Sequence, residues 1–379
     1  MIGNDIDALS GMVRDSAGEG ERQAAEYIAG RLRSIGVSEV RTERFRGRRS
    51  YAPAHAAHTL AGLLLAARTG LLARLGALAL LASLELDASG RFTWVDRLLP
   101  SGQGTNAFGR IPPRGGGAAE RTLVIVAHHD AARTGLVWNP RIFEAGRERR
   151  LKIRRIDGFM LPVGAGFALA AIPFGPLRRL GAVLLGVATA AVAEVGFGST
   201  VPGASDNASG VAATLALAEE LVAAPLDGVE VLIWSVGCEE SGMDGMRSAL
   251  ASHALDPATT FILGLDTLGA GAPILAAAEG TMLTHRYGES AMAVVDAAAD
   301  EARLQRPERW RIGGWTDPIL ARFAGHDAVS LLSIGPDGLF TNYHVPTDTA
   351  DRVDLESVDA CLDLARAVID RFRSGPKAD

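Results

Sequence analysis

Acidic and histidine side chains recur in five short segments of this chain, and three of these segments follow predicted buried strands. His128, Glu239 and Asp266 come after the apolar runs 122–127, 229–236 and 260–265. The carboxyl ends of strands in an open α/β sheet face one crevice, so we expect these side chains to meet there. Imidazole and carboxylate donors together favour zinc or a similar divalent ion.

The other candidate donors complete a set that is large enough for two ions. Asp206 lies in a Ser-Asp-Asn segment where a helix is predicted to begin at 208, and His344 lies in a Tyr-His pair. Glu239 and Glu240 are adjacent, so one can bind metal while the other accepts a proton from water. This pattern predicts a metal-assisted hydrolase.

Each segment also has an ordinary structural explanation. Asp206 could cap the following helix, and the pair Glu239-Glu240 could begin another helix. Asp266 could be a turn residue and His344 a loop histidine. These explanations require five independent coincidences in a fixed order, so we favour a common metal site.

The order of the segments resembles that of the M28 metallopeptidases, of the two-zinc aminopeptidase type. The matching stretches are AHHD (127–130), GASDNASG (203–210), CEESG (238–242), LDTLG (265–269) and NYHVPTDT (342–349). The resemblance covers roughly 120–136 and 200–373, and the elements at 19–46 fit the start of the family's domain. The long, apolar segment between His128 and Asp206 departs from the simpler members.

The resemblance implies a role for each residue of the site. One ion would be held by His128 and Asp266, the other by Glu240 and His344, and Asp206 would bridge them. The resemblance also implies that Glu239 is the general base and later the proton donor. Tyr343 would help to polarise the scissile carbonyl, and Asp130 would orient His128. The family often has a cis peptide after the bridging aspartate, here Asp206-Asn207.

The function implied is hydrolysis of a peptide bond next to a free N-terminus, with two zinc ions per chain and cobalt or manganese as alternatives. The partner expected is therefore a peptide with a free α-amino group. Other functions stay open: a glutaminyl-cyclase-like acyl transfer, a carboxypeptidase or dipeptidase, and an inactive membrane receptor or scaffold.

The elements that must position these residues indicate an α/β fold. Helices are predicted at 19–35, 208–224, 288–304 and 355–372, and strands at 40–45, 122–127, 229–236, 260–265 and 328–334. Strands and helices alternate, so we expect a three-layer αβα sandwich around a mostly parallel mixed sheet, of the zinc-exopeptidase kind, with inserted apolar helices.

Composition is consistent with a large core and excludes one class of partner. Of the 379 residues, 48% are hydrophobic, and the net charge of −6 argues against a nucleic-acid binder. The two cysteines, Cys238 and Cys361, cannot build a disulfide framework.

Two apolar stretches interrupt the alternating pattern. We assign 1–56, 85–157 and 196–379 to one discontinuous catalytic domain, 57–84 to a re-entrant or interfacial insertion, and 158–195 to a helical hairpin that anchors the chain in a membrane. Each arm of the hairpin approaches the roughly 20 residues that span hydrocarbon. The expected second partner is thus a lipid bilayer, with a helical cap over the active site as the alternative.

Charge predicts on which side of the membrane the catalytic domain lies. The lead-in to the second insertion is far more basic than its turn, which holds Arg178 and Arg179. The basic lead-in residues are Arg147, Arg149, Arg150, Lys152, Arg154 and Arg155. The positive-inside rule then places the catalytic domain in the cytoplasm. The N-terminus lacks the pattern of a signal peptide, which agrees with a cytoplasmic site, membrane-associated or soluble.

Overall fold

A mixed, mostly parallel sheet forms the centre of the protein. The computed structural model describes residues 2–144 and 146–374. Its sheet has the order β1-β2-β4-β3-β5-β9-β6-β7, with β8 beside β6. The strands are β1 (Ser38–Gly47), β2 (Gly102–Ile111), β3 (Arg121–His128), β4 (Val229–Val236), β5 (Thr260–Leu265), β6 (Ala272–Glu279), β7 (His285–Arg286), β8 (Glu308–Ile312) and β9 (Asp327–Ile334). Strands β4, β3, β5 and β9 are parallel, and β1 and β2 add an antiparallel edge.

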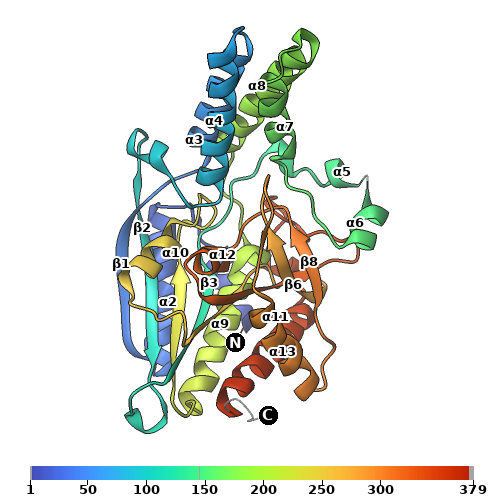
Figure 1. Cartoon of the computed structure of the whole chain (residues 1–379). Helices are drawn as coiled ribbons and strands as arrows, with labels where there is room; N and C mark the ends of the chain where they lie inside the picture. Colours follow the sequence, from blue (N-terminus) through green and yellow to red (C-terminus); the bar gives the residue numbers. More distant parts are fainter. Residues whose placement is uncertain (1, 145, 375–379) are drawn as a thin grey trace.

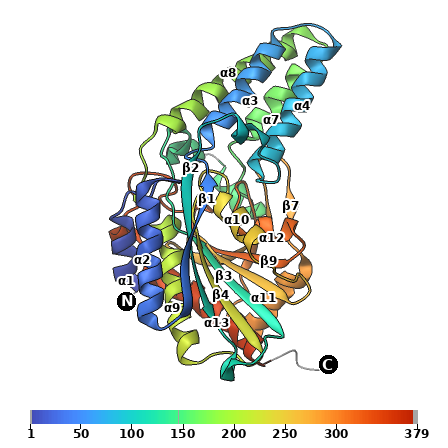
Figure 2. The ribbon, with the colours of Figure 1, turned by 90° about the vertical axis from the view of Figure 1, so that its left-hand side faces the viewer.

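Helices cover both faces of this sheet, which confirms the predicted αβα architecture. One layer contains α2, α9 and α13, which contact one another in that order, while α10 and α12 pack together against the sheet (Figure 2). The helices of the catalytic body are α1 (Ile2–Ser10), α2 (Glu19–Ile35), α9 (Ser209–Ala223), α10 (Asp244–Ser252), α11 (Glu289–Glu301), α12 (Pro318–Phe323) and α13 (Leu355–Ser374). Short helices fill the connections: η1 (Trp94–Arg97), η2 (Arg114–Gly116), η3 (Leu136–Trp138), α5 (Pro140–Phe143), α6 (Arg147–Ile153), η4 (Ala204–Ala208) and η5 (Ala350–Arg352).

Local sequence signals determine several of these boundaries. Helix α2 occupies the predicted 19–35 and ends at Gly36, whose φ of 96° is left-handed and whose N–H caps Arg33 and Leu32. Strands β4 and β5 occupy their predicted ranges, and both are buried along nearly their whole length. Such continuously apolar strands are typical of a parallel sheet that is covered on both faces.

The two apolar insertions form helical hairpins that pack against each other. They consist of α3 (Ala52–Ala66), α4 (Leu71–Ala88), α7 (Leu161–Ala170) and α8 (Gly175–Phe197). The first hairpin turns at 67–70, around Thr69-Gly70. Helix α8 contacts both α3 and α7, and α4 contacts α7. We call these four helices the bundle; it projects from one end of the catalytic body (Figures 1 and 2).

The bundle has a small apolar core of its own, separate from the core of the catalytic body. That core contains Ala66, Ala77, Leu84, Met160, Val163, Phe167, Ala170 and Leu185. The helices α3 and α4 extend beyond the predicted insertion 57–84. The prediction stopped short because the inner turns of both helices carry polar residues. His55 and Asp87 on these turns are buried where the bundle meets the catalytic body, so an apolar stretch in the sequence marks only the outer part of each helix.

Candidate metal centre

The predicted metal ligands converge at the end of the sheet where the parallel strands finish. His128 is the last residue of β3, Asp266 follows β5 directly, and Glu240 lies in the turn after β4. Asp206 belongs to η4, immediately before α9, and His344 lies in the loop after β9. All five side chains are at least mostly buried. The fold therefore brings together residues that are up to 216 positions apart in the chain (344 − 128).

Asp206 lies at the centre of the group and faces two histidines at once. Its Oδ1 is 3.3 Å from His128 Nε2, and its Oδ2 is 3.2 Å from His344 Nε2. The two oxygens of one carboxylate thus point to two different imidazoles. This is the arrangement expected of a carboxylate that bridges two cations.

One further carboxylate lies beside each histidine. Asp266 Oδ1 is 3.8 Å from His128 Nε2, and Glu240 Oε2 is 3.2 Å from His344 Nε2. The ligand atoms of His128, Asp206 and Glu240 all lie within 4.8 Å of one another. This compact trio combines donors from both halves of the site, because Asp206 stands between them.

The donor set fits divalent cations such as zinc. Three of the ligand atoms, Asp206 Oδ2, Glu240 Oε1 and His344 Nε2, are buried without a hydrogen bond to any described residue. Buried polar atoms of this kind are costly unless something binds them. Two imidazoles and three carboxylates are the ligand types that zinc accepts.

The acidic groups of the site are crowded and buried, and their pKa values are shifted as a result. Burial and the neighbouring Glu240 raise the pKa of Glu239 well above its usual value, although His128 opposes the shift. Burial also raises the pKa of Glu240 to about 7, with His344 opposing and Asp206 adding to it. The pKa of Asp206 moves the other way: burial would raise it, but the two imidazoles beside its oxygens lower it. A bound cation would favour the ionised form of all these carboxylates.

Asp130 positions several parts of the site. Its Oδ1 is 3.4 Å from His128 Nδ1, and its carboxylate accepts hydrogen bonds from the backbone N–H groups of Glu239 and Glu240, each at 3.1 Å. Ser16 donates a fourth contact at 2.7 Å. A carboxylate behind a metal-binding histidine commonly fixes the orientation of the ring. Here the same carboxylate also holds the turn that carries the two glutamates.

The remaining predicted residues lie at the site with defined surroundings. The ring of Tyr343 stacks on His344, with 3.7 Å between centroids. The peptide bond Asp206-Asn207 is cis, as the family resemblance implied. His129, the neighbour of His128, points elsewhere: its Nδ1 lies 3.0 Å from the Ser235 hydroxyl, and burial lowers its pKa to about 4.

Three buried charged residues near the site were not predicted from the sequence. Arg14 donates to the carbonyls of His129, Pro202 and Gly203, and burial lowers its pKa to about 10. Asp348 accepts from the N–H groups of Ser205 and Asp206, and burial raises its pKa to about 7. Asp317 is fully buried, and its Oδ1 has no hydrogen bond to a described residue. Arg14 places a buried positive charge near the carboxylates of the site, including Asp130, Asp206 and Asp348.

A cavity of about 90 Å³ adjoins the ligands and ends against the bundle. Its inner wall holds Glu239, Glu240 and His344. Its outer wall comes from the two insertions and the segment between them, with Tyr51, His55, Asp87, Trp138, Phe159 and Met160. The insertions therefore shape the space next to the metal ligands, in addition to projecting from the catalytic body.

Comparison with known proteins identifies the family. Residues 187–369 match the sequence model of peptidase family M28. This segment belongs to peptidase family M28. The matched segment contains Asp206, Glu239, Glu240, Asp266 and His344; His128 and Asp130 precede it. The recognition from the sequence motifs is thus confirmed, and the family makes this M28 protein a metallopeptidase. No curated protein matches it in sequence.

Solved structures confirm the fold of the whole chain. An aminopeptidase from Aneurinibacillus sp. strain AM-1 is similar with a TM-score of 0.59 and 17% identity, over 98% of this chain and 93% of that one. The zinc aminopeptidase BSAP from Bacillus subtilis has a TM-score of 0.59 and 15% identity, over 100% and 96%. A glutaminyl cyclase from Bacteroides thetaiotaomicron has a TM-score of 0.56 and 15% identity, over 97% and 94%. At these identities the likeness shows the zinc-aminopeptidase fold and leaves the reaction open.

Proposed function

We propose that this M28 protein is a two-zinc aminopeptidase that removes residues from peptides with a free N-terminus. The observation that carries the proposal is the carboxylate of Asp206, which lies between two clusters of metal donors. The bundle bounds one side of the cavity beside these donors. A wall at this place favours a substrate that ends at the metal centre, as the substrate of an exopeptidase does.

Zinc, when bound, would supply a more acidic water and polarise the scissile carbonyl. The protein's own groups supply the proton transfers. The Oε2 of Glu239 lies 4.0 Å from His128 Nε2. The carboxylate of Glu239 is not among the proposed metal ligands. We assign it the proton of the attacking water, which it then delivers to the leaving amine. Tyr343 lies in the cavity beside His344, where its hydroxyl would stabilise the developing oxyanion.

Glutaminyl-cyclase-like transfer is the second candidate, because glutaminyl cyclases share the fold and the cavity holds the indoles of Trp138 and Trp315. A panel of substrates separates the candidates. An aminopeptidase releases p-nitroaniline from aminoacyl-p-nitroanilides and ignores N-acetylated versions. A cyclase converts glutaminyl-β-naphthylamide to the pyroglutamyl product without releasing naphthylamine. A carboxypeptidase cleaves N-blocked peptides with a free C-terminus, and a scaffold shows no turnover with zinc present.

We also propose that the bundle holds the protein in a lipid bilayer, with the catalytic body in the cytoplasm. Large apolar side chains face outward on its helices: Leu60, Leu64, Leu71, Leu72, Leu75, Leu78, Leu180, Val183 and Val187. Leu72 is 85% exposed and Val187 is 64% exposed. An apolar surface of this extent is unfavourable in water and marks a site of interaction.

Helix length also supports the membrane proposal. Within the described residues, α8 (Gly175–Phe197) is long and apolar enough to cross a membrane, and only 22% of its most apolar window is buried. A core helix of a soluble protein would be mostly buried. Both hairpins return to the catalytic body, so the bundle enters the bilayer and leaves it on the same side. The basic residues of α6 and of the segment directly after it then lie on the catalytic side, as the positive-inside rule requires for the cytoplasm.

Polar substitutions on the outer surface of the bundle should release the protein from membranes. We expect a variant with Leu64, Leu72, Leu75, Val183 and Val187 changed to Gln to move to the soluble fraction after a carbonate wash, while the unmodified protein stays in the pellet. The substitutions leave the bundle's own core intact, because none of these side chains belongs to it.

A matched control changes exposed apolar residues of the catalytic body instead. Val13, Leu283 and Leu355 are 68%, 59% and 48% exposed. Their change to Gln should leave the protein in the pellet. An unmodified protein that is soluble and monomeric without detergent would contradict the membrane proposal, and one that is soluble as a dimer would assign the apolar surface to a second copy.

A further inference from the structure

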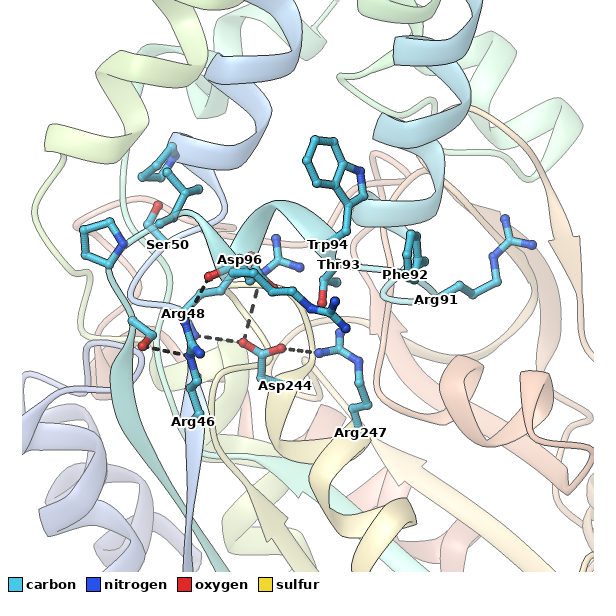
Figure 3. A pocket seen from close by; sticks show the side chains of 16 residues that line it. Arg46, Arg48, Ser50, Arg91, Phe92, Thr93, Trp94, Asp96, Asp244 and Arg247 are labelled. Carbon is cyan, nitrogen blue, oxygen red and sulfur yellow. Dashed lines mark hydrogen bonds and ion pairs between the residues drawn. The ribbon is translucent and has the colours of Figure 1, made fainter.

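We propose that a cavity at the base of the bundle, here called the arginine pocket, binds the headgroup of an anionic phospholipid. The proposal rests on the membrane attachment proposed above. The arginine pocket adjoins the cavity beside the metal ligands, with which it shares Arg48, and it contains none of the metal ligands. Figure 3 shows the pocket from close by, where the chain enters α3 and leaves α4.

The pocket is formed by segments that join the bundle to the catalytic body. One wall consists of residues 46–53, which connect β1 to α3, and the other of residues 91–101, which connect α4 to β2. Asp244 and Arg247 of α10 form the floor (Figure 3). The cavity has a volume of about 360 Å³, about four times that of the cavity beside the metal ligands. It is large enough for a phosphate with its attached alcohol.

Five arginines line this cavity: Arg46, Arg48, Arg91, Arg97 and Arg247. Three of them, Arg48, Arg91 and Arg247, already have carboxylate partners. Arg48 contacts Asp87 at 2.8 Å and Asp96 at 3.0 Å, and Arg247 is paired with Asp244. These pairs neutralise the floor and the inner wall of the pocket.

The positive charge that remains lies at the mouth. Arg46 is exposed, and its partners among the described residues are neutral oxygens, the Ser101 hydroxyl at 2.9 Å and the Asp96 carbonyl at 3.0 Å. Arg97 is also exposed, and no ion pair joins it to another described residue. Arg91 lies further out, 3.8 Å from Glu85 and over the ring of Phe323. The guanidinium groups of Arg46 and Arg97 are therefore available to a phosphodiester, which carries one negative charge.

Apolar and aromatic side chains continue from the mouth of the pocket onto the bundle. Phe92 and Trp94 line the pocket and are 54% and 39% exposed. The indole N–H of Trp94 donates to Ser83 of α4, which holds the ring against that helix. Aromatic rings gather at the level of lipid headgroups in membrane proteins, with basic residues just outside them. The same order is found here: the apolar helix α4 is followed by the ring of Trp94 and then by the arginines of the pocket.

The position of the pocket favours a lipid over a free phosphate. Helix α4 has 18 residues and is therefore about 27 Å long; its polar inner turn is buried against the catalytic body, and the rest of the helix projects away from it. Its inner end meets the arginine pocket, and its outer end carries Arg74 near the turn residue Arg68. A bundle that enters the bilayer to this depth would bring its base, and the pocket, to the level of the phosphates. A lipid bound there could lay its chains on the exposed leucines of α3 and α4.

Binding of short-chain lipids to the purified full-length protein in a non-ionic detergent tests the proposal. Titration calorimetry with dihexanoyl phosphatidylglycerol should show one site. Arg46→Gln and Arg97→Gln should each weaken it about fivefold, and the double variant about thirtyfold, since a basic side chain near a phosphate contributes a similar factor to lipid binding. Both side chains are exposed, so the variants should keep the thermal stability of the parent.

Two controls make the result specific to the pocket. Arg33 and Arg44 are also exposed but do not line the cavity, so their double change to Gln should leave the affinity unaltered. Dihexanoyl phosphatidylcholine and inorganic phosphate should bind at least tenfold more weakly than phosphatidylglycerol. Equal binding by the pocket double variant, or equal binding of phosphatidylcholine, would overturn the proposal, and equal binding of inorganic phosphate would reduce it to a free-anion site. Membrane pelleting is measured separately, so loss of attachment and loss of this site can be distinguished.

Discussion

Replacing Glu239 with Gln should lower turnover by about 10²-fold or more while the protein keeps its fold and its metal. Glutamine has the shape of the glutamate but cannot accept the proton of the attacking water. The backbone N–H of Glu239 donates to Asp130, and this contact does not depend on the side chain. Steady-state rates on an aminoacyl-p-nitroanilide, measured together with zinc content, would show the effect.

The adjacent glutamate provides the matched control. Glu240 Oε2 is 3.2 Å from His344 Nε2, so Glu240→Gln should lose metal as well as activity. The two variants differ by one position in the same turn and remove the same chemical group. A metal-loaded Glu239→Gln protein with near-normal turnover would contradict the assignment of the base.

The order of chemical groups along the chain indicated which side chains would meet at one edge of the sheet, because several of them follow an element with a clear local signal. His128 and Asp266 end or follow strands whose unbroken apolar runs are easy to recognise. The sheet then places both residues at one edge, as it does in any parallel arrangement. What the sequence could not supply is the distance between them, which depends on the register of four parallel strands.

The antiparallel edge of the sheet was only half predicted, for a physical reason. Strand β2 has the sequence GQGTNAFGRI, with three glycines and few of the β-branched residues that favour strands. It forms because tertiary contacts require it: the ring of Phe45 and the sulfur of Cys238 fill the space above Gly104. Any side chain at Gly104 would collide with these atoms, so a residue with weak strand propensity is needed in a strand.

The sequence also did not indicate the residues whose side chains hold backbone groups of the site. Arg14 reaches the carbonyl of His129, 115 positions away, and that of Gly203, 189 positions away. No local pattern in the sequence connects these segments. Asp348 lies in the NYHVPTDT stretch, close to His344, and that proximity to a predicted ligand was the one available signal. Its carboxylate anchors the N–H groups of Ser205 and Asp206 and so fixes the loop that carries the central ligand.

Composition indicated the apolar insertions, with a helical cap over the active site as the alternative to a membrane hairpin, but it did not indicate which of their residues would line the cavity. Length and hydropathy identify helices that could enter a membrane, and these properties say nothing about the inner turns. Tyr51 and His55 at the start of α3, and Asp87 at the end of α4, line the cavity beside Glu239. A residue's place in a wall formed by two distant segments depends on how the hairpins pack, which their sequences alone do not specify.

Replacing Asp206 with Ala should remove both metal ions together. Its two oxygens face His128 at 3.3 Å and His344 at 3.2 Å, so each half of the site loses a ligand when the carboxylate is removed. The loop should keep its path, because Asp348 holds the backbone N–H of Asp206 and not its side chain. Elemental analysis of protein purified without chelators should give about two ions per chain before the change and close to none after it.

Asp266 provides the comparison that separates a shared ligand from an unshared one. Its Oδ1 lies 3.8 Å from His128 Nε2, and no contact of its side chain with His344 is present among the described residues. Asp266→Ala should therefore lose the ion held with His128 and retain the ion held by Glu240 and His344, giving about one per chain. Thermal unfolding with added zinc would report the same difference without an activity assay, because an ion that binds only the folded state raises the melting temperature. If the parent protein instead saturates at one ion with full activity, Asp206 is not a bridge, and the single-metal chemistry of a glutaminyl-cyclase-like enzyme becomes the better description of this site.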